Sequence, residues 1–369
     1  LFDSAINYAW NAAVIELREK VRRFGIHIIP QIIDRDFDEK KLLDQKDSEL
    51  LNICLRLNLI SEHGYFMLDQ CRDIRNNFSS AHPTIGQLDE DEFINFVNRV
   101  SKYALNNEQN PQAVDIQTFI SSIHAGAFSE DQYRVWCERI EKTFEAQRET
   151  IFGMLHGIYC DPSKGQESRV NAITIVQRLI ERLTPSIASL LINRHQDYQA
   201  KGEAERHRAS QGFFENLHLI GLLSEAERHA IISNACKKLL SVHNSFDNFH
   251  NEPPFAERLN LLTDKQAIPT TTQPEYVETV ITCSVGNSYG TSNTADSVYY
   301  TKMISSFTPR EVQIVLELPE GSSLLAQRLK SSSRCKNKYA EIISSLDPLS
   351  ITPTMKTSYA KWMKVKNTA

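Results

Sequence analysis

The sequence predicts a mainly α-helical protein, and three observations support this fold class. Over residues 1–268, apolar side chains recur three or four positions apart, which is the period of a helix that buries one face. Residues that typically start and stop helices flank several of these stretches. The chain has 369 residues, 41% of them hydrophobic, which is enough for two or three domains. We find no repeat of fixed period, so a regular solenoid is not predicted.

Residues 1–110 are predicted to form four helices. The first is expected to start at Asp3 or Ser4 and to end at Gly25. Its apolar positions follow the helical period: Ile6, Trp10, Ala13, Val14, Leu17 and Val21. The second helix is predicted over residues 50–60, after a charged loop around residues 30–44.

The third helix is predicted from about Tyr65 to His82, because Pro83 disfavours helix at the residue before it. The fourth begins at Asp89 and Glu92, a pair that resembles a capping box. Its apolar face consists of Phe93, Phe96, Val97, Val100 and Ala104. Short connections between the four helices favour an up-and-down bundle.

Residues 111–268 are predicted to form a second, helical domain. Amphipathic stretches cover residues 131–158, 167–183 and 225–241, and Pro185 opens a further helix. Residues 200–209 are almost wholly polar, which indicates a linker or an exposed helix.

Residues 269–369 are predicted to form a smaller, mixed α/β region. The Thr-, Gln- and Pro-rich run Pro269–Gln273 marks its boundary. The segment Tyr276–Val285 is rich in Val, Ile and Thr and is predicted to be a strand. A polar loop follows over residues 286–297, and Thr308 with the proline after it predicts a helix start.

Cysteine usage and charge restrict the classes of protein. Seven scattered cysteines without a CxxC pair argue against a disulfide framework and a zinc finger, so we expect a reducing cytoplasm. No run approaches the roughly 18 apolar residues of a membrane span, and no cofactor motif appears. The net charge is −5, yet residues 301–369 hold 11 Lys/Arg and 5 Asp/Glu, which gives them +6 and the rest −11. A basic region beside an acidic body indicates a phosphate-binding surface or a solvated face.

The third predicted helix places an arginine and a histidine on one face. Arg75 and His82 are seven residues apart, so at 100° per residue they align, about 10 Å apart along the axis. Arg72 and Ser79 share that face. The neighbouring face carries a stripe predicted to be core: Met67, Cys71, Ile74, Phe78 and Ala81.

These residue types suit cleavage of RNA without a metal. A histidine can remove the proton from the attacking 2′-hydroxyl or protonate the leaving 5′-oxygen, because it titrates near neutral pH. An arginine binds phosphate oxygens in bidentate fashion and stays charged. One arginine and one histidine make half of such a site, and two copies across a twofold axis complete it.

Three Arg–His pairs with similar spacing occur, and two of them straddle predicted helix ends: Arg22/His27 and Arg56/His63. Arg75 and His82 lie within one predicted helix, and Asn76 directly follows the arginine. This stretch resembles the motif of the HEPN superfamily, which consists of an arginine, a polar residue, a short spacer and a histidine. The resemblance covers the motif and a bundle of about 110 residues.

Members of that superfamily are mostly small helical bundles, and many are metal-independent endoribonucleases that act as dimers in toxin and anti-phage (abortive infection) systems. The resemblance implies that His82 is the acid and base, that Arg75 stabilises the phosphate and that Asn76 supports it. A homodimer or higher oligomer, an RNA substrate and a regulatory protein partner are the expected partners.

Two other functions fit the sequence. The first is a non-catalytic scaffold that uses the bundle for dimerisation; burial of Arg75 or His82 among apolar neighbours would favour it. The second is a nucleic-acid-binding regulator that uses the basic C-terminal region, and the predicted RNA-binding residues are Arg72, Arg328, Lys330, Arg334, Lys336 and Lys338. A metal site at His243, Asp247 and His250 is the weaker interpretation of polar residues near a helix end.

Overall fold

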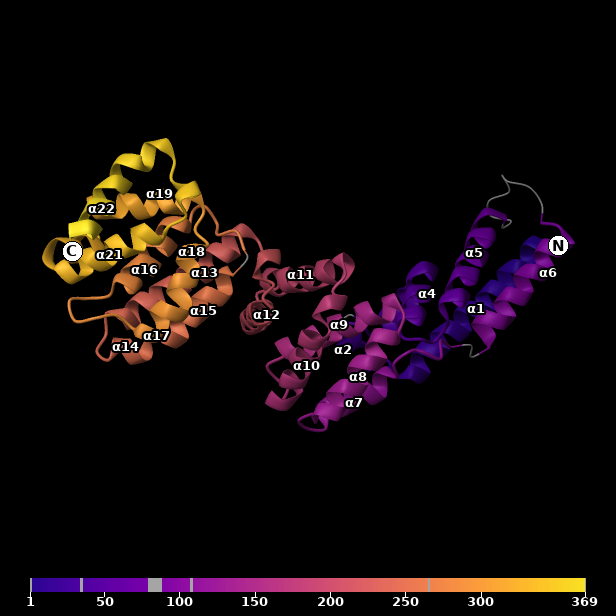
Figure 1. Ribbon diagram of the computed structural model, residues 1–369. Helices are drawn as coiled ribbons and strands as arrows, with labels where there is room; N and C mark the ends of the chain where they lie inside the picture. The colour runs from indigo at the N-terminus through magenta and orange to yellow at the C-terminus, as the bar shows by residue number, and fades with distance from the viewer. Residues whose placement is uncertain (1, 34–35, 79–87, 107–108, 265, 369) are drawn as a thin grey trace. The chain divides into compact units, whose positions relative to one another are not determined.

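The computed structural model describes residues 2–33, 36–78, 88–106, 109–264 and 266–368 (Figure 1). These described residues contain helices and no β-strand, so the predicted mainly α-helical fold class is confirmed. The chain divides into two compact units, unit 1 (residues 1–217) and unit 2 (residues 218–369), whereas the sequence predicted three domains. None of the described helices combines the length and the apolar character needed to cross a membrane.

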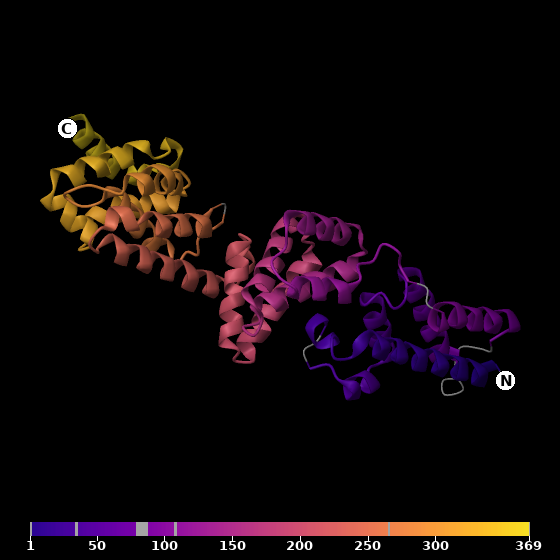
Figure 2. The same ribbon diagram turned by 90° about the horizontal axis from the view of Figure 1, so that it is seen from below.

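Unit 1 begins with helices that pack around α1. In both views α1 runs beside α5 and α6 (Figures 1 and 2), and it contacts α4 and η1 as well. The apolar positions predicted for the first helix are all buried, so its predicted core face is confirmed. The elements of this part are α1 (Phe2–Gly25), α2 (Ile29–Ile32), α3 (Glu39–Asp44), α4 (Asp47–Arg56), α5 (Glu62–Phe78), α6 (Glu90–Arg99) and the π-helix η1 (Val100–Leu105).

Helix α5 carries the candidate arginine, and its buried side differs in part from the predicted stripe. Gly64, Leu68 and Cys71 are buried, whereas Met67, Ile74 and Phe78 are only partly buried. The buried line is therefore rotated slightly away from the predicted one. The last residue of that stripe, Ala81, lies outside the described residues, as does His82.

Helix α9 is the central element of the remainder of unit 1. It contacts α2, α4, α8, α10, α11 and α12, and most of its residues are buried. The amphipathic stretch predicted over residues 131–158 forms two helices, because Thr143 and Phe144 adopt extended backbone between α8 and α9. The elements are α7 (Ile116–His124), α8 (Glu130–Lys142), α9 (Glu145–Cys160), α10 (Gln166–Arg178), η2 (Ile180–Arg182), α11 (Pro185–Ala200) and α12 (Ala204–Asn216).

Unit 2 is built around α16, which contacts α13, α19, α20 and α21. Its first half contains η3 (Ile220–Leu222), α13 (Glu225–His243), α14 (Asn248–Asn251), α15 (Pro253–Thr263), α16 (Gln273–Val285), α17 (Asn293–Ala295), η4 (Asp296–Tyr300) and α18 (Thr301–Ser305). Its second half contains α19 (Pro309–Glu317), η5 (Leu318–Glu320), α20 (Leu324–Ser331), α21 (Ser333–Ser345), η6 (Pro348–Ser350), η7 (Pro353–Met355) and α22 (Lys356–Thr368).

The predicted strand over Tyr276–Val285 is wrong, because this segment forms most of α16. Ten of the thirteen residues of α16 are buried, so most of the helix surface is covered and only its first two turns carry less buried side chains. A short apolar run rich in β-branched residues looks the same in sequence whether it is a buried strand or a buried helix. Contacts from several surrounding helices decide the outcome here.

Candidate functional site

Arg75 lies in the last turn of α5 and is held at the edge of the helical core. Its side chain is 35% exposed, so the guanidinium is neither buried among apolar residues nor fully solvated. Nη1 donates a hydrogen bond of 3.0 Å to Oδ1 of Asn76, the polar residue of the motif. The same Nη1 lies 4.0 Å from Oδ2 of Asp47.

Asp47 connects this arginine to the rest of the bundle. It is the first residue of α4, where a negative charge is favoured by the helix dipole. Its Oδ2 also accepts a hydrogen bond of 2.7 Å from Nε1 of Trp10, a buried residue of α1. Trp10, Asp47 and Arg75 thus link α1, α4 and α5, and they orient the guanidinium without covering it.

No sequence pattern connects Asp47 with Arg75 or Trp10, because these partners lie on two other helices. Arg72 is also on α5, but its Nη2 is within 3.0 Å of Asp69 and 2.9 Å of Asp73. These two carboxylates compensate its charge locally, which weakens the expectation that Arg72 binds phosphate. Of the three motif residues, the structure therefore brings Arg75 and Asn76 together; His82 lies outside the described residues.

Two of the basic residues predicted to bind RNA in unit 2 contact groups of the protein itself. Arg334 donates from Nη1 to the carbonyl oxygens of Val285 (3.0 Å) and Asn287 (2.6 Å). Lys338 forms an ion pair of 2.7 Å with Asp296. Arg334 thus has a structural role, because it satisfies carbonyls at the end of α16.

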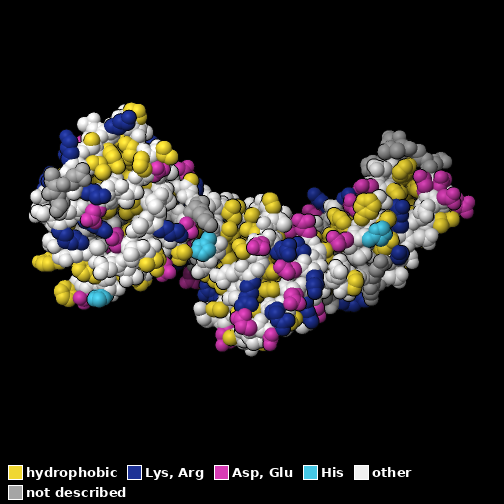
Figure 3. Space-filling view, in the orientation of Figure 1, with side chains coloured by type: hydrophobic (Ala, Val, Ile, Leu, Met, Phe, Trp, Pro, Cys, Tyr) yellow, Lys and Arg dark blue, Asp and Glu magenta, His cyan; other side chains and the backbone are white. Residues whose placement is uncertain are grey.

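Arg328 has a structural role of the same kind, whereas Lys330 and Lys336 are exposed. Figure 3 shows Lys and Arg side chains interspersed with Asp and Glu over the visible face, with no single basic field. An RNA-binding role stays a prediction for all five residues.

Unit 2 contains a buried polar network centred on His243. Its Nε2 lies 2.7 Å from Nη1 of Arg328, which can only donate, so Nε2 accepts. The ring proton is therefore on Nδ1, which donates to Oε2 of Glu252 at 3.1 Å. Oε1 of the same carboxylate accepts from the hydroxyl of Tyr300 at 2.5 Å. Arg328 also donates to the carbonyl oxygen of Gly286 at 2.7 Å.

The network is completely enclosed at its acidic end, where Glu252 has no exposed surface. Burial, together with the nearby Cys283 and Glu252, raises the pKa of the Tyr300 hydroxyl, which keeps it protonated and able to donate. Burial also lowers the pKa of Arg328, but the pKa of an arginine is so high that the side chain stays charged. The network thus compensates the Glu252 charge through His243 and Arg328.

Ligand atoms of His243, Glu252 and Cys283 lie within 4.8 Å of one another, which is close enough to hold a metal ion. The donor set does not favour one, since Arg328 already occupies Nε2 of the histidine and places a positive charge beside the group. The other two residues of the predicted metal set, Asp247 and His250, are exposed, whereas His243 points into the core. That set is therefore not assembled by the fold.

Five of the cysteine thiols are poorly suited to act as nucleophiles. Burial raises the pKa of Cys54, Cys160 and Cys236 to about 12, and that of Cys71 and Cys137 to about 11. A thiol with such a pKa is almost wholly protonated at neutral pH and reacts slowly.

No protein-family model matches this chain, and neither a curated protein nor a solved structure matches it.

Proposed function

We propose that this protein is a metal-independent endoribonuclease of the HEPN kind. The observation that carries the proposal is the setting of Arg75. It is partly exposed in the last turn of α5, its guanidinium is hydrogen-bonded to Asn76, and Asp47 lies 4.0 Å away. A pre-oriented, accessible guanidinium is suited to bind phosphate oxygens in bidentate fashion.

The proposed reaction is a transfer of the phosphate within the RNA. The 2′-oxygen attacks the adjacent phosphorus and loses its proton to a base, while the 5′-oxygen leaves and gains a proton from an acid. His82 takes these proton roles by the resemblance, and Arg75 stabilises the charge on the phosphorane oxygens. The products are a 2′,3′-cyclic phosphate and a 5′-hydroxyl, so no metal or water is consumed in this step.

A homodimer is part of the proposal, because one chain supplies one arginine and one histidine to a reaction that needs both an acid and a base. By the resemblance, we further propose that the protein is a toxin-like or anti-phage effector of the cytoplasm whose activity a regulatory partner restrains. Burial of Arg75 among apolar neighbours would have favoured the scaffold alternative, and its side chain is instead 35% exposed.

The test compares purified variants on total RNA in the presence of EDTA. Wild-type protein is expected to produce fragments that end in 2′,3′-cyclic phosphate. Arg75→Ala and His82→Ala are expected to abolish them, and Asn76→Ala to reduce their rate by about tenfold through loss of one charge-assisted hydrogen bond.

The matched control is His63→Ala, which removes an exposed histidine of the same helix that belongs to another of the Arg–His pairs. This variant should cleave as the wild type does, and far-UV circular dichroism should give the same helicity for all variants. Cleavage by His82→Ala at the wild-type rate would contradict the proposal.

A further inference from the structure

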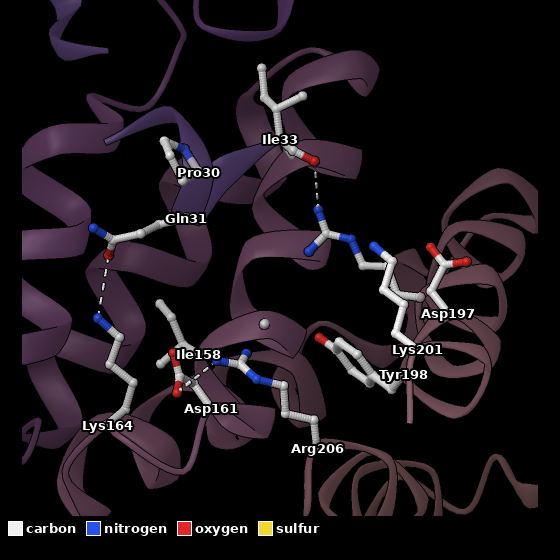
Figure 4. Close-up of a pocket in the computed structure, with 12 residues that line it drawn as sticks. Pro30, Gln31, Ile33, Ile158, Asp161, Lys164, Asp197, Tyr198, Lys201 and Arg206 are labelled. Carbon is white, nitrogen blue, oxygen red and sulfur yellow. Dashed lines mark hydrogen bonds and ion pairs between the residues drawn. The ribbon is translucent and has the colours of Figure 1, made fainter. Parts of the chain in front are cut away.

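Two turns of unit 2 each carry an aromatic side chain that the fold leaves in solvent. Phe246 is 92% exposed in the turn 244–247, between α13 and α14, and Tyr289 is 90% exposed in the turn 286–292, between α16 and α17. Among the described residues, no other Phe, Tyr or Trp is as exposed. Tyr198 of unit 1, by contrast, lines a cavity yet is only 2% exposed (Figure 4). Leaving two rings in water forgoes the stabilisation that their burial would provide, which indicates a role outside the fold.

One guanidinium bonds to both turns. Nη1 of Arg328 donates to the carbonyl oxygen of Gly286 at 2.7 Å, and its Nη2 donates to Oδ1 of Asn244 at 3.2 Å. Both turns therefore lie at one end of unit 2, beside α14 and the loop that leads into α17 (Figure 1). Phe246 follows Asn244 by two residues, and Tyr289 follows Gly286 by three. Segments of this length span at most roughly 11 Å, so one extended ligand can reach both rings.

The backbone of the turn 286–292 is held by contacts within it and with α14. Oδ1 of Asn287 accepts hydrogen bonds from the backbone amides of Tyr289 at 2.9 Å and of Gly290 at 3.2 Å. The hydroxyl of Ser292 donates to the carbonyl oxygen of Phe249 at 2.8 Å, and Phe249 belongs to α14, which directly follows the other turn. The backbone at Tyr289 is thus fixed in advance of a ligand, which lowers the entropic cost of binding.

The turn 244–247 is anchored at both of its ends. Asp247 has φ of 59°, in the left-handed region that aspartate tolerates better than most residues. Nδ2 of Asn248 donates to the carbonyl oxygen of His243 at 2.8 Å, and both of these residues are buried. The ends of the turn are therefore fixed in the core of unit 2, and Phe246 remains outside it.

The surroundings of the two rings are polar. Asn287 and Ser288 offer hydrogen-bonding groups, and Asp247 is the one carboxylate of the two turns. Arg334 donates from Nη1 to the carbonyl oxygen of Asn287 at 2.6 Å and forms no ion pair with a described residue, so it brings a positive charge to this turn. Exposed rings, hydrogen-bonding groups and an arginine suit a single-stranded nucleic acid, because its bases stack on aromatic faces and its phosphate oxygens accept hydrogen bonds.

We propose that this end of unit 2 binds single-stranded RNA by stacking unpaired bases on Phe246 and Tyr289, with Arg334 as a phosphate contact. A lipid surface fits the turns less well, because insertion of the rings would bring the carboxylate of Asp247 against it. The choice of RNA rests on the proposed function, whereas the surface contains no residue of the Arg–His motif. It holds a strand and does not cut it.

The experiment measures fluorescence anisotropy of the full-length chain with a labelled oligouridylate of about 12 nucleotides, a length that such surfaces bind. Its 2′-hydroxyls are methylated, so the proposed cleavage cannot occur. The Phe246→Ala/Tyr289→Ala double variant should bind at least tenfold more weakly than the wild type, because each stacked base contributes separately. The matched control is Leu349→Ala, which removes a side chain of unit 2 that is 93% exposed outside the two turns and should bind as the wild type does.

An abasic strand of the same length separates stacking from charge. It keeps the phosphates, so the wild type should bind it at least tenfold more weakly than the oligouridylate, and the double variant should bind it as the wild type does. Equal affinity of the wild type for the two strands would overturn the proposal, because the bases would then not be recognised.

Two further results would also overturn it. One is equal affinity of the double variant and Leu349→Ala for the oligouridylate, or no binding by the wild type. The other is binding of phosphatidylserine vesicles that the double variant loses, without binding of the oligonucleotide, which would assign the rings to a membrane. Because the methylated strand cannot be cut, its binding is measured whether or not the chain is a nuclease, so failure of either proposal is distinguishable from failure of the other.

Discussion

Glu252 is a carboxylate with no exposed surface, and its charge is tolerated because two groups hydrogen-bond to it. Nδ1 of His243 contacts one of its oxygens and the hydroxyl of Tyr300 contacts the other. Arg328 supplies the compensating positive charge from beyond the imidazole. Removing one member of such a network leaves the others buried without their partners, which costs more than the network contributes as a whole.

We therefore expect Glu252→Gln to lower the free energy of unfolding by about 3 kcal/mol. This value is near the lower end of the range for breaking a buried ion pair, because Arg328 keeps some contact with solvent. Urea denaturation followed by circular dichroism measures this change. The matched control Glu320→Gln alters an exposed residue of the same unit and should stay within about 0.5 kcal/mol of wild type. Equal midpoints for the two variants would show that the network does not stabilise unit 2.

The carboxyl group of Asp161 should make the stability of the fold depend on pH. Its partial burial alone would raise the carboxyl pKa, but hydrogen bonds from Ser163 and the charge of Arg206 outweigh burial and lower the pKa below its ordinary value of 3.8. Because the folded pKa is lowered, this carboxylate stabilises the fold above pH 3.8. That contribution is lost as the pH falls through the lower folded value.

Asp161→Asn should accordingly lower the free energy of unfolding at pH 7. Between about pH 5 and 3, where carboxyl groups usually titrate, the variant should lose less stability than the wild type does. Thermal unfolding at several pH values measures both effects. Asp131→Asn serves as the control, since Asp131 is 85% exposed in its pair with Arg134. If Asp161→Asn and wild type lose stability in parallel on acidification, the assigned interaction with Arg206 is wrong.

At the scale of elements, the end of α16 is a turn whose geometry requires glycine. Gly286 has φ of 75°, which residues with a side chain rarely adopt, and an added Cβ would lie 2.1 Å from the carbonyl oxygen of Gly290. Arg328 and Arg334 donate to carbonyls of this turn, so its shape is also fixed by α20 and α21. The turn and the two helices therefore depend on one another.

Gly286→Ala is expected to cost about 3 kcal/mol through backbone strain and the contact with Gly290. Gly321→Ala is the matched control: its φ is −79°, and the nearest atom to an added Cβ is 3.6 Å away. Chemical denaturation of both variants tests the expectation. A Gly286→Ala protein as stable as the Gly321→Ala protein would exclude a conformational requirement at this turn.

Features of helices that depend on nearby residues were predictable from the sequence. The capping pair Asp89 and Glu92 forms as expected, Thr308 caps α19, and Pro185 opens α11. Each of these signals involves residues within one turn of the helix. The helical state of α16 was not predictable in the same way, because its burial comes from helices that lie elsewhere in the chain.

In the candidate site too, the contact between sequence neighbours was predictable and the contact between helices was not. Asn76 is adjacent to Arg75 in sequence, and its predicted support of the arginine agrees with the hydrogen bond between them. Asp47, which also faces that arginine, comes from another helix and carries no sequence signal. The role of Arg328 was missed for the same reason, since its partner His243 lies 85 residues earlier in the chain.

At the scale of the molecule, contacts across the predicted boundaries explain why the structure has two units. His229 of α13 hydrogen-bonds to Thr272 at 2.7 Å, so the predicted boundary near residue 268 lies inside unit 2. Nε of Arg56 in α4 donates to the hydroxyl of Thr150 in α9 at 2.8 Å, which ties the helices before residue 110 to those after it within unit 1. Polar composition alone did not distinguish such internal turns from linkers.

We expect the fragments 1–217 and 218–369 each to fold when they are produced separately, because each forms a compact unit with its own buried core. The sum of their far-UV circular dichroism spectra should equal the spectrum of the whole chain, and each should unfold cooperatively. A break at residue 268, within unit 2, provides the comparison and should yield a poorly folded C-terminal piece. An unfolded 218–369 fragment would contradict the division.

The network around His243 also has a consequence for the order of events during synthesis. Arg328 is added 85 residues after His243, which at about 5–20 residues per second corresponds to roughly 4–17 s of translation. During that interval Glu252 lacks the cation that compensates it in the finished fold, so the early helices of unit 2 cannot reach their final packing. Unit 1 is a compact unit by itself and is synthesised first, so it can complete its core while unit 2 is still being made.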